Sequence, residues 1–201
     1  LIDTAGLRRK SRIIENIELY SVLRTSRAIE RCDVAVVVLD AEIGIEDQDK
    51  KIINMVDDAR KGMLIAVNKW DLIEKDENTA DRYVNAIHNL IRTYDYVPVI
   101  FVSALTKQRI TKIIEYCFKI HELRANRIST SKLNKILIPV FEKTPPPSVK
   151  GKDLRINYIT QVKTRPPVFA FFCNHPHLLP DSYKRFMERR LREHFDFSGT
   201  P

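Results

Sequence analysis

The sequence predicts an α/β protein in two parts, a larger domain with a parallel sheet and a smaller α+β module. Three apolar runs, at residues 34–39, 63–67 and 97–102, are typical of parallel strands that are buried on both faces. Helical spacings of apolar residues follow these runs, and such alternation implies right-handed crossovers and helices on both faces of a sheet. The pattern changes after residue 125, so we place the domains at residues 1–125 and 126–201.

Two helices of the first part are predicted from stripes of apolar side chains. The first stripe consists of Tyr83, Ile87, Leu90 and Tyr94. The second consists of Ile110, Ile113, Ile114 and Cys117. Each stripe indicates a helical segment of this domain with one apolar side.

The second part begins with a linker at residues 127–131 and then predicts a helix. The apolar positions of this helix are Leu133, Ile136, Leu137 and Val140. Pro139 lies inside it and should end or kink it near Ile138, because proline lacks the N–H that a helix interior needs.

Two strands and a last helix complete this module. Leu154, Ile156 and Tyr158 alternate with polar residues, which predicts a strand with one buried face, and residues 168–172 predict a second strand. The last helix starts near Pro180, and its apolar side carries Tyr183, Met187, Leu191 and Phe195. Its other side carries Arg185, Arg189 and Arg192.

The most informative motif is Asn68-Lys69-Trp70-Asp71, directly after the apolar run at 63–67. An Asp carboxylate in this place can accept hydrogen bonds from two N–H groups on one edge of guanine. Adenine lacks that pair of donors, so a buried carboxylate would reject it. Ser103-Ala104 follows the next apolar run in the same way. Ligands of open α/β sheets bind at the carboxyl ends of the strands, so the two motifs should lie together.

A third motif, Leu1-Ile2-Asp3-Thr4-Ala5-Gly6, opens the chain. In phosphate-loop nucleotide hydrolases, a carboxylate at the end of a strand holds the Mg²⁺ shell, which predicts Asp3 as a magnesium ligand acting through water. Gly6 has no side chain, so its backbone can approach a terminal phosphate closely. Taken alone, the motif is more typical of a strand that ends in an Asp-Thr turn than of a nucleotide site. The other two motifs, in the right order, favour the nucleotide site.

The sequence contains no Gly-x-x-x-x-Gly-Lys-Ser/Thr loop, which would cradle the phosphates of such a nucleotide. The chain also begins in the middle of a predicted strand. We therefore expect a fragment of a longer protein, whose phosphate loop and first switch precede Leu1 and whose last strand follows Pro201.

Composition favours a globular protein of the cytoplasm without a membrane segment. No apolar run approaches the roughly 20 residues that span a bilayer. Three widely separated cysteines without metal-like spacing are typical of free thiols in a reducing compartment. Residues 1–125 contain 20 Lys+Arg and 20 Asp+Glu, whereas residues 126–201 contain 14 and 6. The whole net charge of +8 thus lies in the C-terminal part, which indicates contact with a polyanion such as RNA or a basic surface that only aids solubility.

The sequence resembles the Der (EngA) family of double-Era-like GTPases along nearly its whole length. The motifs that carry this resemblance are Leu-Ile-Asp-Thr-Ala-Gly at 1–6, Tyr-Ser-Val-Leu-Arg-Thr at 20–25, Ala-Ile-Glu at 28–30, Gly-Ile-Glu-Asp-Gln-Asp at 44–49, Val-Asn-Lys-Trp-Asp at 67–71, Pro-Pro at 146–147 and Leu-Pro-Asp-Ser-Tyr-Lys-Arg at 179–185. The resemblance implies two tandem G domains and a C-terminal KH-like domain that act in assembly of the large ribosomal subunit. Residues 1–125 would be most of the second, phosphate-loop-type G domain, and 126–201 most of the KH-like domain.

The resemblance also implies roles for individual residues. The GTP- or GDP-binding positions would be Asp3, Thr4, Ala5, Gly6, Leu7, Asn68, Lys69, Trp70, Asp71, Ser103, Ala104 and Leu105. Leu7 stands where Ras-like enzymes carry the Gln that orients the attacking water, and a leucine cannot accept that hydrogen bond. The family often requires potassium, but the residue that would bind K⁺ lies in the missing phosphate loop.

The resemblance also implies binding partners. The expected partners are the large ribosomal subunit with its rRNA and an upstream G domain of the same chain. RNA-binding KH modules clamp the backbone with a Gly-x-x-Gly loop, which this sequence lacks. RNA contact would then come from the basic surface with Arg185, Arg189 and Arg192, or the module would serve mainly as a docking surface for a G domain. The alternative function is a non-enzymatic RNA-binding or scaffold module with a vestigial G fold.

Overall fold

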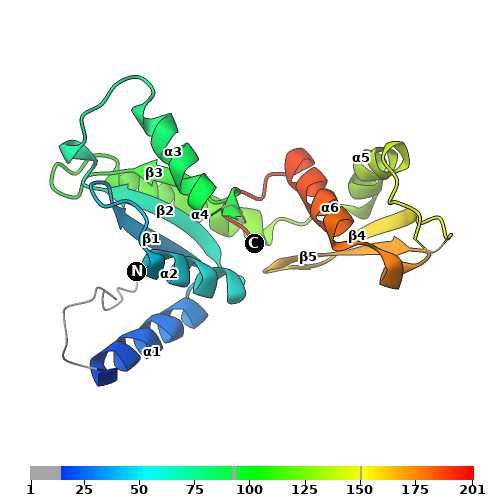
Figure 1. Ribbon diagram of the computed structural model, residues 1–201, viewed down its shortest axis with the longest axis horizontal. Coiled ribbons are helices and arrows are strands. Elements are labelled where there is room, and N and C mark those ends of the chain that lie inside the picture. The colour runs from blue at the N-terminus through cyan, green and yellow to red at the C-terminus, as the bar shows by residue number, and fades with distance from the viewer. Residues whose placement is uncertain (1–14, 92–93, 150) are drawn as a thin grey trace. The chain divides into compact units, whose positions relative to one another are not determined.

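The computed structural model describes residues 15–91, 94–149 and 151–201 of the chain (Figure 1). The chain forms two compact units. The first comprises residues up to Glu122 together with Ser198–Pro201, and the second comprises Leu123–Phe197. Within the described residues, no helix has the length and apolar character needed to cross a membrane.

The first unit is built on a three-stranded parallel sheet of β1 (Val34–Asp40), β2 (Gly62–Asn68) and β3 (Val99–Phe101), in the order β1-β2-β3. The central strand β2 is buried at every position but its last, as its continuous apolar run predicts. Asp40 pairs with Asn68 at the ends of β1 and β2, so both strands finish at the same edge of the sheet.

Helices cover both faces of this sheet and make a three-layer α/β/α arrangement. On one face, α2 (Asp47–Asp58) and α3 (Thr79–Leu90) place Ile53 and Ile87 in a core with Ile65. Helix α1 (Glu15–Arg31) adds Ile29 to the same core. On the other face, α4 (Ile110–Ala125) packs Ile120 against strand residues that include Leu64. The predicted fold class is therefore confirmed for this unit.

Four apolar residues of this unit are not placed as the sequence patterns indicate. Val38 is 58% exposed, so strand β1, which is an edge strand among the described residues, is not buried on both faces. Leu90 is largely exposed at the end of α3, and Tyr94 lies beyond that helix. Ile114 also points to solvent from α4. Helical spacing identified the helices correctly but assigned too wide an apolar face to each.

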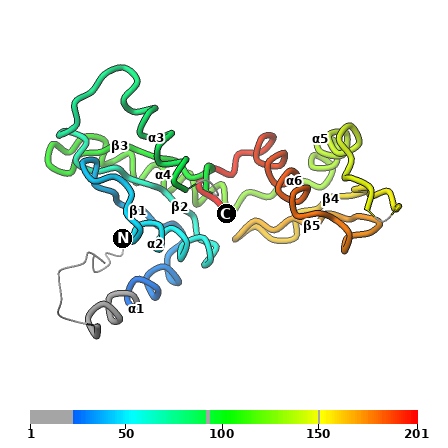
Figure 2. The backbone as a smooth tube through the Cα atoms, viewed as in Figure 1, coloured from blue at the N-terminus to red at the C-terminus, as the bar shows by residue number. Residues whose placement is uncertain are grey.

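The segment Ser198–Pro201 returns to the first unit and extends the pairing of β2 (Figure 2). The N–H of Met63 donates to the carbonyl of Gly199 at 2.8 Å, and the N–H of Gly199 donates to the carbonyl of Tyr96 at 2.8 Å. Gly199 has φ +68, and a Cβ there would lie 2.6 Å from the carbonyl oxygen of Met63. Only glycine suits both the backbone conformation and the close approach.

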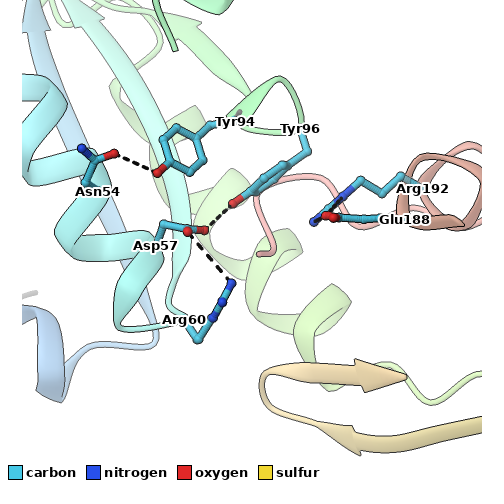
Figure 3. Close-up of polar contacts among 7 residues, drawn as sticks. All are labelled: Asn54, Asp57, Arg60, Tyr94, Tyr96, Glu188 and Arg192. Atoms are coloured by element: carbon cyan, nitrogen blue, oxygen red, sulfur yellow. Dashed lines mark hydrogen bonds and ion pairs between the residues drawn. The ribbon is translucent and has the colours of Figure 1, made fainter. Parts of the chain in front are cut away.

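The loop that contains Tyr96 is tied to α2 by two tyrosine hydroxyls (Figure 3). Tyr94 donates to Oδ1 of Asn54 at 2.8 Å, and Tyr96 donates to Oδ1 of Asp57 at 2.9 Å. The other oxygen of Asp57 lies 4.0 Å from Nη1 of Arg60. These contacts fix the approach to β3.

The second unit has the order helix, strand, strand, helix. Helix α5 (Thr130–Lys143) and helix α6 (Asp181–His194) pack against an antiparallel pair, β4 (Ile156–Thr164) and β5 (Pro167–Cys173). A short 3₁₀ turn, η3 (Pro176–Leu178), precedes α6. The core contains Leu133, Leu137, Phe141, Ile156, Ile159, Tyr183, Met187, Leu191, Phe195 and Phe197. The predicted apolar side of the last helix is confirmed.

The helix does not end near Ile138, because α5 continues through Pro139 to Lys143. A proline inside a helix costs about 3 kcal/mol. Leu137 and Phe141, on either side of it, are almost wholly buried, and each such side chain gains about 1.5–3 kcal/mol from burial. Core packing therefore outweighs the local penalty.

Tyr158 is 44% exposed, so its predicted place on the buried face of β4 is wrong. The register of the strand pair shifts between Ile156 and Tyr158, and a bulge of this kind reverses the alternation of side chains. Ile159 takes the inward position instead. Asn134 of α5 accepts a hydrogen bond from the N–H of Ile159 at 2.9 Å and donates one to the carbonyl of Ile159 at 2.7 Å. One amide side chain thus satisfies the irregular backbone.

Candidate guanine nucleotide site

The candidate site lies at the carboxyl edge of the sheet, where the loops after β2 and β3 meet. Oδ1 of Asn68 accepts a hydrogen bond from the N–H of Ala104 at 3.0 Å. The N–H of Trp70 donates to the carbonyl of Val102 at 3.1 Å. Ser103 is fully buried, and its Oγ accepts from the N–H of Thr106 at 3.0 Å. The structure therefore brings the Asn-Lys-x-Asp and Ser-Ala motifs together, as the sequence predicts.

Asp71 follows in a single turn of 3₁₀ helix, η1 (Trp70–Leu72). Its Oδ1 is buried, and no group in the described part of the chain donates a hydrogen bond to it. A buried carboxylate oxygen without a donor costs free energy in the empty protein. A ligand with N–H groups would remove that cost, so the carboxylate suits the N–H edge of guanine.

The other predicted residues of these loops differ in their placement. Trp70 is buried, with its ring 4.1 Å from that of Phe101 and 5.0 Å from that of Tyr83. Its side chain belongs to the core, so only its backbone is available to a nucleotide. Leu105 is 83% exposed. Lys69 has φ 61 and ψ 30, a left-handed conformation in which its side chain leaves the end of β2.

Asp40 lies at the same edge of the sheet, but the sequence motifs did not identify it as a site residue. Its carboxylate lies at the end of β1, and its Oδ2 is 2.7 Å from Nζ of Lys69. The signal that could have found it is the pattern shared with Asn68 and Ser103, a polar residue at the end of an apolar run.

The chain after η1 is fixed at the start of α3 by Asp76. Its Oδ1 accepts from the N–H of Asn78 and from Oγ1 of Thr79, and its Oδ2 accepts from Arg82 at 2.9 Å. The hydrogen bond from Arg82, and to a smaller extent those from Thr79 and Asn78, lower the pKa of Asp76 to about 2. This network fixes the loop beyond Asp71.

Part of the predicted site is outside the described residues. Asp3, Thr4, Ala5, Gly6 and Leu7 all precede residue 15. No group of three or more His, Cys, Asp or Glu side chains that could hold a metal ion occurs among residues 15–91, 94–149 and 151–201. The magnesium prediction for Asp3 stays a prediction.

The three candidate RNA-binding arginines lie on the outer side of α6, but their surroundings differ. Arg185 is exposed. Arg189 is also exposed, with its Nε 4.0 Å from Glu193. The side chain of Arg192 is only 20% exposed, and its guanidinium donates twice to Oε1 of Glu188, at 2.9 and 3.1 Å (Figure 3). Arg185 and Arg189 are thus the more accessible cations.

Both units match known protein families. Residues 22–122 match the GTP-binding domain of elongation factor Tu, and residues 127–201 match the KH-domain-like region at the C-terminus of EngA bacterial GTPase enzymes. A crystal structure of Aquifex aeolicus Era with GDP and AlF4⁻ shares the fold, at a TM-score of 0.50 and 16% identity over 96% of this chain and 69% of that one. The fold and the edge residues define a G domain joined to a KH-like domain.

The relatives identify the family. GTPase Der of Chloroherpeton thalassium is 53% identical over all 201 residues, and GTPase Der of Chlorobium phaeobacteroides is 50% identical over the same length. The chain belongs to the Der (EngA) family of GTPases. It covers 46% of the length of each of these two relatives.

Proposed function

We propose that this chain is the guanine-reading part of a GTP-binding and GTP-hydrolysing switch protein that acts in assembly of the large ribosomal subunit. One observation carries the nucleotide part of the proposal. Oδ1 of Asp71 is buried without a hydrogen-bond donor, at the sheet edge where Asn68 fixes Ala104. Guanine supplies two N–H groups on one edge, and a site built to receive them discriminates strongly against bases that lack them.

Each described residue of the edge has a distinct task in this proposal. Asp71 accepts from the guanine edge, the stem of Lys69 covers one face of the base, and Ala104 offers backbone next to Asn68. Asp3 would hold Mg²⁺ through water, and Mg²⁺ would neutralise charge on the phosphates. Gly6 would approach the terminal phosphate, while Leu7 would leave water activation to other groups.

The ribosomal part of the proposal rests on the positive charge of the KH-like unit. Residues 126–201 hold the entire excess of eight positive charges, and Arg185 and Arg189 present theirs to solvent on α6. Phosphate contacts of this kind supply most of the affinity for nucleic acid. We place the rRNA of the large subunit on this surface and an upstream G domain of the same protein as the second partner, in the cytoplasm.

The experiment that tests the nucleotide part exchanges Asp71 for Asn in the full-length protein. An amide presents an N–H where the carboxylate presents an oxygen, so it suits the carbonyl of xanthine in place of the amine of guanine. GDP affinity should fall by tenfold or more, since a hydrogen bond to a charged group contributes about 1.5–3 kcal/mol. XDP affinity should rise relative to GDP.

Titration calorimetry with GDP and XDP gives both affinities. Asp81→Asn is the matched control, because Asp81 is an exposed acid on α3 of the same unit. Its two affinities should equal those of the wild type. An unchanged ratio of GDP to XDP affinity in Asp71→Asn would reject the site, and absence of nucleotide binding in the wild type would favour a vestigial G fold that serves as a scaffold.

A further inference from the structure

Asp40 is a buried acid at the candidate site, and recognition of the base by Asp71 does not explain its presence there. Its side chain is 4% exposed at the end of β1, and its Oδ2 lies 2.7 Å from Nζ of Lys69. A carboxylate so removed from water is stable as an ion only with a charged partner or several hydrogen bonds. Lys69, whose side chain is 46% exposed, provides that charge from the rim of the site.

The ion pair directs the lysine side chain from the end of β2 to the end of β1. Asp40 and Asn68 are direct partners in the parallel ladder of β1 and β2. Lys69 follows Asn68 in a left-handed conformation, so its side chain starts at the end of β2 and finishes at the end of β1. The methylene stem therefore spans the gap between two strand ends. The apolar stem of a lysine that is held by its charged end offers a surface on which a planar ring can lie.

Asp40 is itself held rigidly by the turn that follows β1. Its Oδ1 accepts from the N–H of Glu42 at 3.1 Å. Its carbonyl accepts from the N–H of Gly44 at 2.8 Å, and Gly44 has φ +80, which closes the turn. The next residue, Ala41, donates its N–H to the carbonyl of Asn68 at 2.9 Å. The acid is thus fixed to both strands before any ligand arrives.

We propose that Asp40 is a positioning residue that holds the stem of Lys69 extended against the face of the guanine base. The inference rests on the proposed nucleotide site and adds a residue to it. An unrestrained lysine has large rotamer freedom, which it must lose on binding. Asp40 removes that freedom in the free protein, so binding costs less. Glu42 lies farther from Nζ, at 3.9 Å, and is half-exposed, so it contributes little.

A double-mutant cycle in the full-length protein tests this role. Asp40→Asn keeps the shape of the side chain and an oxygen for the N–H of Glu42, but removes the charge. It should weaken GDP binding about tenfold, the scale expected when one charge-assisted contact is lost. In a Lys69→Met background, whose apolar side chain needs no partner acid, Asp40→Asn should have no further effect. Glu42→Gln should change GDP affinity less than Asp40→Asn.

A second ligand separates positioning from base recognition. Inosine diphosphate has the same ring plane as GDP but lacks the exocyclic amine. Asp40→Asn should weaken both ligands by the same factor, whereas Asp71→Asn should change their ratio. Asp47→Asn is the matched control, because Asp47 is 91% exposed and pairs with Lys50 at 3.0 Å. It should leave both affinities unchanged.

Each outcome decides the inference. An equal loss in the wild-type and Lys69→Met backgrounds would show that Asp40 supports only the fold, and unchanged GDP affinity in Asp40→Asn would reject its role outright. A melting temperature near the wild-type value confirms that the variants are folded. If Asp71→Asn and Lys69→Met both leave GDP and inosine diphosphate binding unchanged, the nucleotide site itself fails, and the inference fails with it.

Discussion

Asn68 and Ala104 lie 36 residues apart in sequence, yet the side-chain oxygen of the first accepts a hydrogen bond from the backbone N–H of the second at 3.0 Å. The bond joins the loops after β2 and β3, so it sets the distance between Asp71 on one loop and the buried Ser103 on the other. A base between the two loops would contact a prearranged edge. Prearrangement lowers the ordering cost of binding.

Replacement of Asn68 by Ala should therefore weaken nucleotide binding more than it weakens the fold. The lost hydrogen bond should cost about 1 kcal/mol of stability, and GDP affinity should fall about tenfold because the two loops can separate. Calorimetric titration and thermal unfolding measure the two effects. Asn54→Ala is the control, since Asn54 also accepts a hydrogen bond, from Tyr94 at 2.8 Å, but on α2. Equal GDP affinities in the two variants would contradict the expected role of Asn68.

Gly199→Ala should destabilise the first unit by about 1–3 kcal/mol, because the new Cβ meets backbone and the φ is left-handed. Gly44→Ala separates the two causes. Gly44 has φ +80 in the same unit, but nothing lies within 4 Å of the position of its Cβ. Chemical denaturation of the full-length variants should show a larger loss for Gly199→Ala. Similar losses would show that φ strain alone is responsible.

The pKa of Tyr183 provides a test in alkaline solution. Burial, helped by the nearby Cys173, raises this pKa to about 12 from its ordinary value of 10. The folded state thus prefers the neutral hydroxyl, which donates to the carbonyl of Thr144 at 2.7 Å. Its stabilising contribution is complete below pH 10 and is lost as the pH rises from 10 to 12.

Thermal unfolding between pH 9 and 12 measures this loss. Tyr183→Phe should be less stable than the wild type at pH 9, because the carbonyl of Thr144 loses its donor. It should lose less stability than the wild type between pH 10 and 12. Parallel curves for the two proteins would show that Tyr183 does not titrate in this range.

The basic side of α6 predicts a salt-dependent contact with ribosomal RNA. Changing Arg185, Arg189 and Arg192 together to Gln should weaken binding to large ribosomal subunits and flatten its dependence on salt, because fewer counterions are released. Arg185 and Arg189 should account for most of the change, since Glu188 already binds Arg192. Co-sedimentation over a salt series measures the slope.

Lys112→Gln, which removes an exposed charge on α4 of the first unit, is the matched control for the arginine variants. GDP affinity should not change in any of them. If the triple variant keeps the wild-type salt slope, the outer side of α6 does not contact RNA, and the charge only solvates the module.

Magnesium dependence tests the segment before residue 15. Asp3→Ala in the full-length protein should abolish the stimulation of GTP hydrolysis by Mg²⁺, because the metal loses the carboxylate that orders its water shell. Leu7→Ala should leave turnover largely intact, since leucine cannot orient water. Single-turnover hydrolysis with and without chelator measures both. A collapse of turnover in a folded Leu7→Ala protein would reverse the assignment of roles.

Much of the fold follows from the sequence because the strands of a parallel sheet are continuous apolar runs. Residues 34–39 and 63–67 became β1 and β2 with at most one added residue at each end. The candidate site was equally visible, since Asn68, Ser103 and Ala104 stand where such runs end. Local pattern and tertiary position coincide at these places.

The remaining features depend on contacts that local pattern does not contain. Pro139 remains helical because residues distant in sequence bury its neighbours. Tyr158 turns outward because Asn134, on another element, stabilises a bulge. Asp40 joins the site only through the register that pairs β1 with β2. Each of these three differences comes from a partner more than ten residues away in the chain.

The hydrogen bonds of Gly199 to Met63 and Tyr96 also affect the order in which the protein can be made. Translation produces β2 long before it produces residue 199, so the start of this strand waits for its last backbone partner while the whole of Leu123–Phe197 is synthesised. Domains usually fold in order as they leave the ribosome. Here the second unit can fold before the first is complete, and a nascent chain arrested within α6 would hold a first unit that is not yet closed.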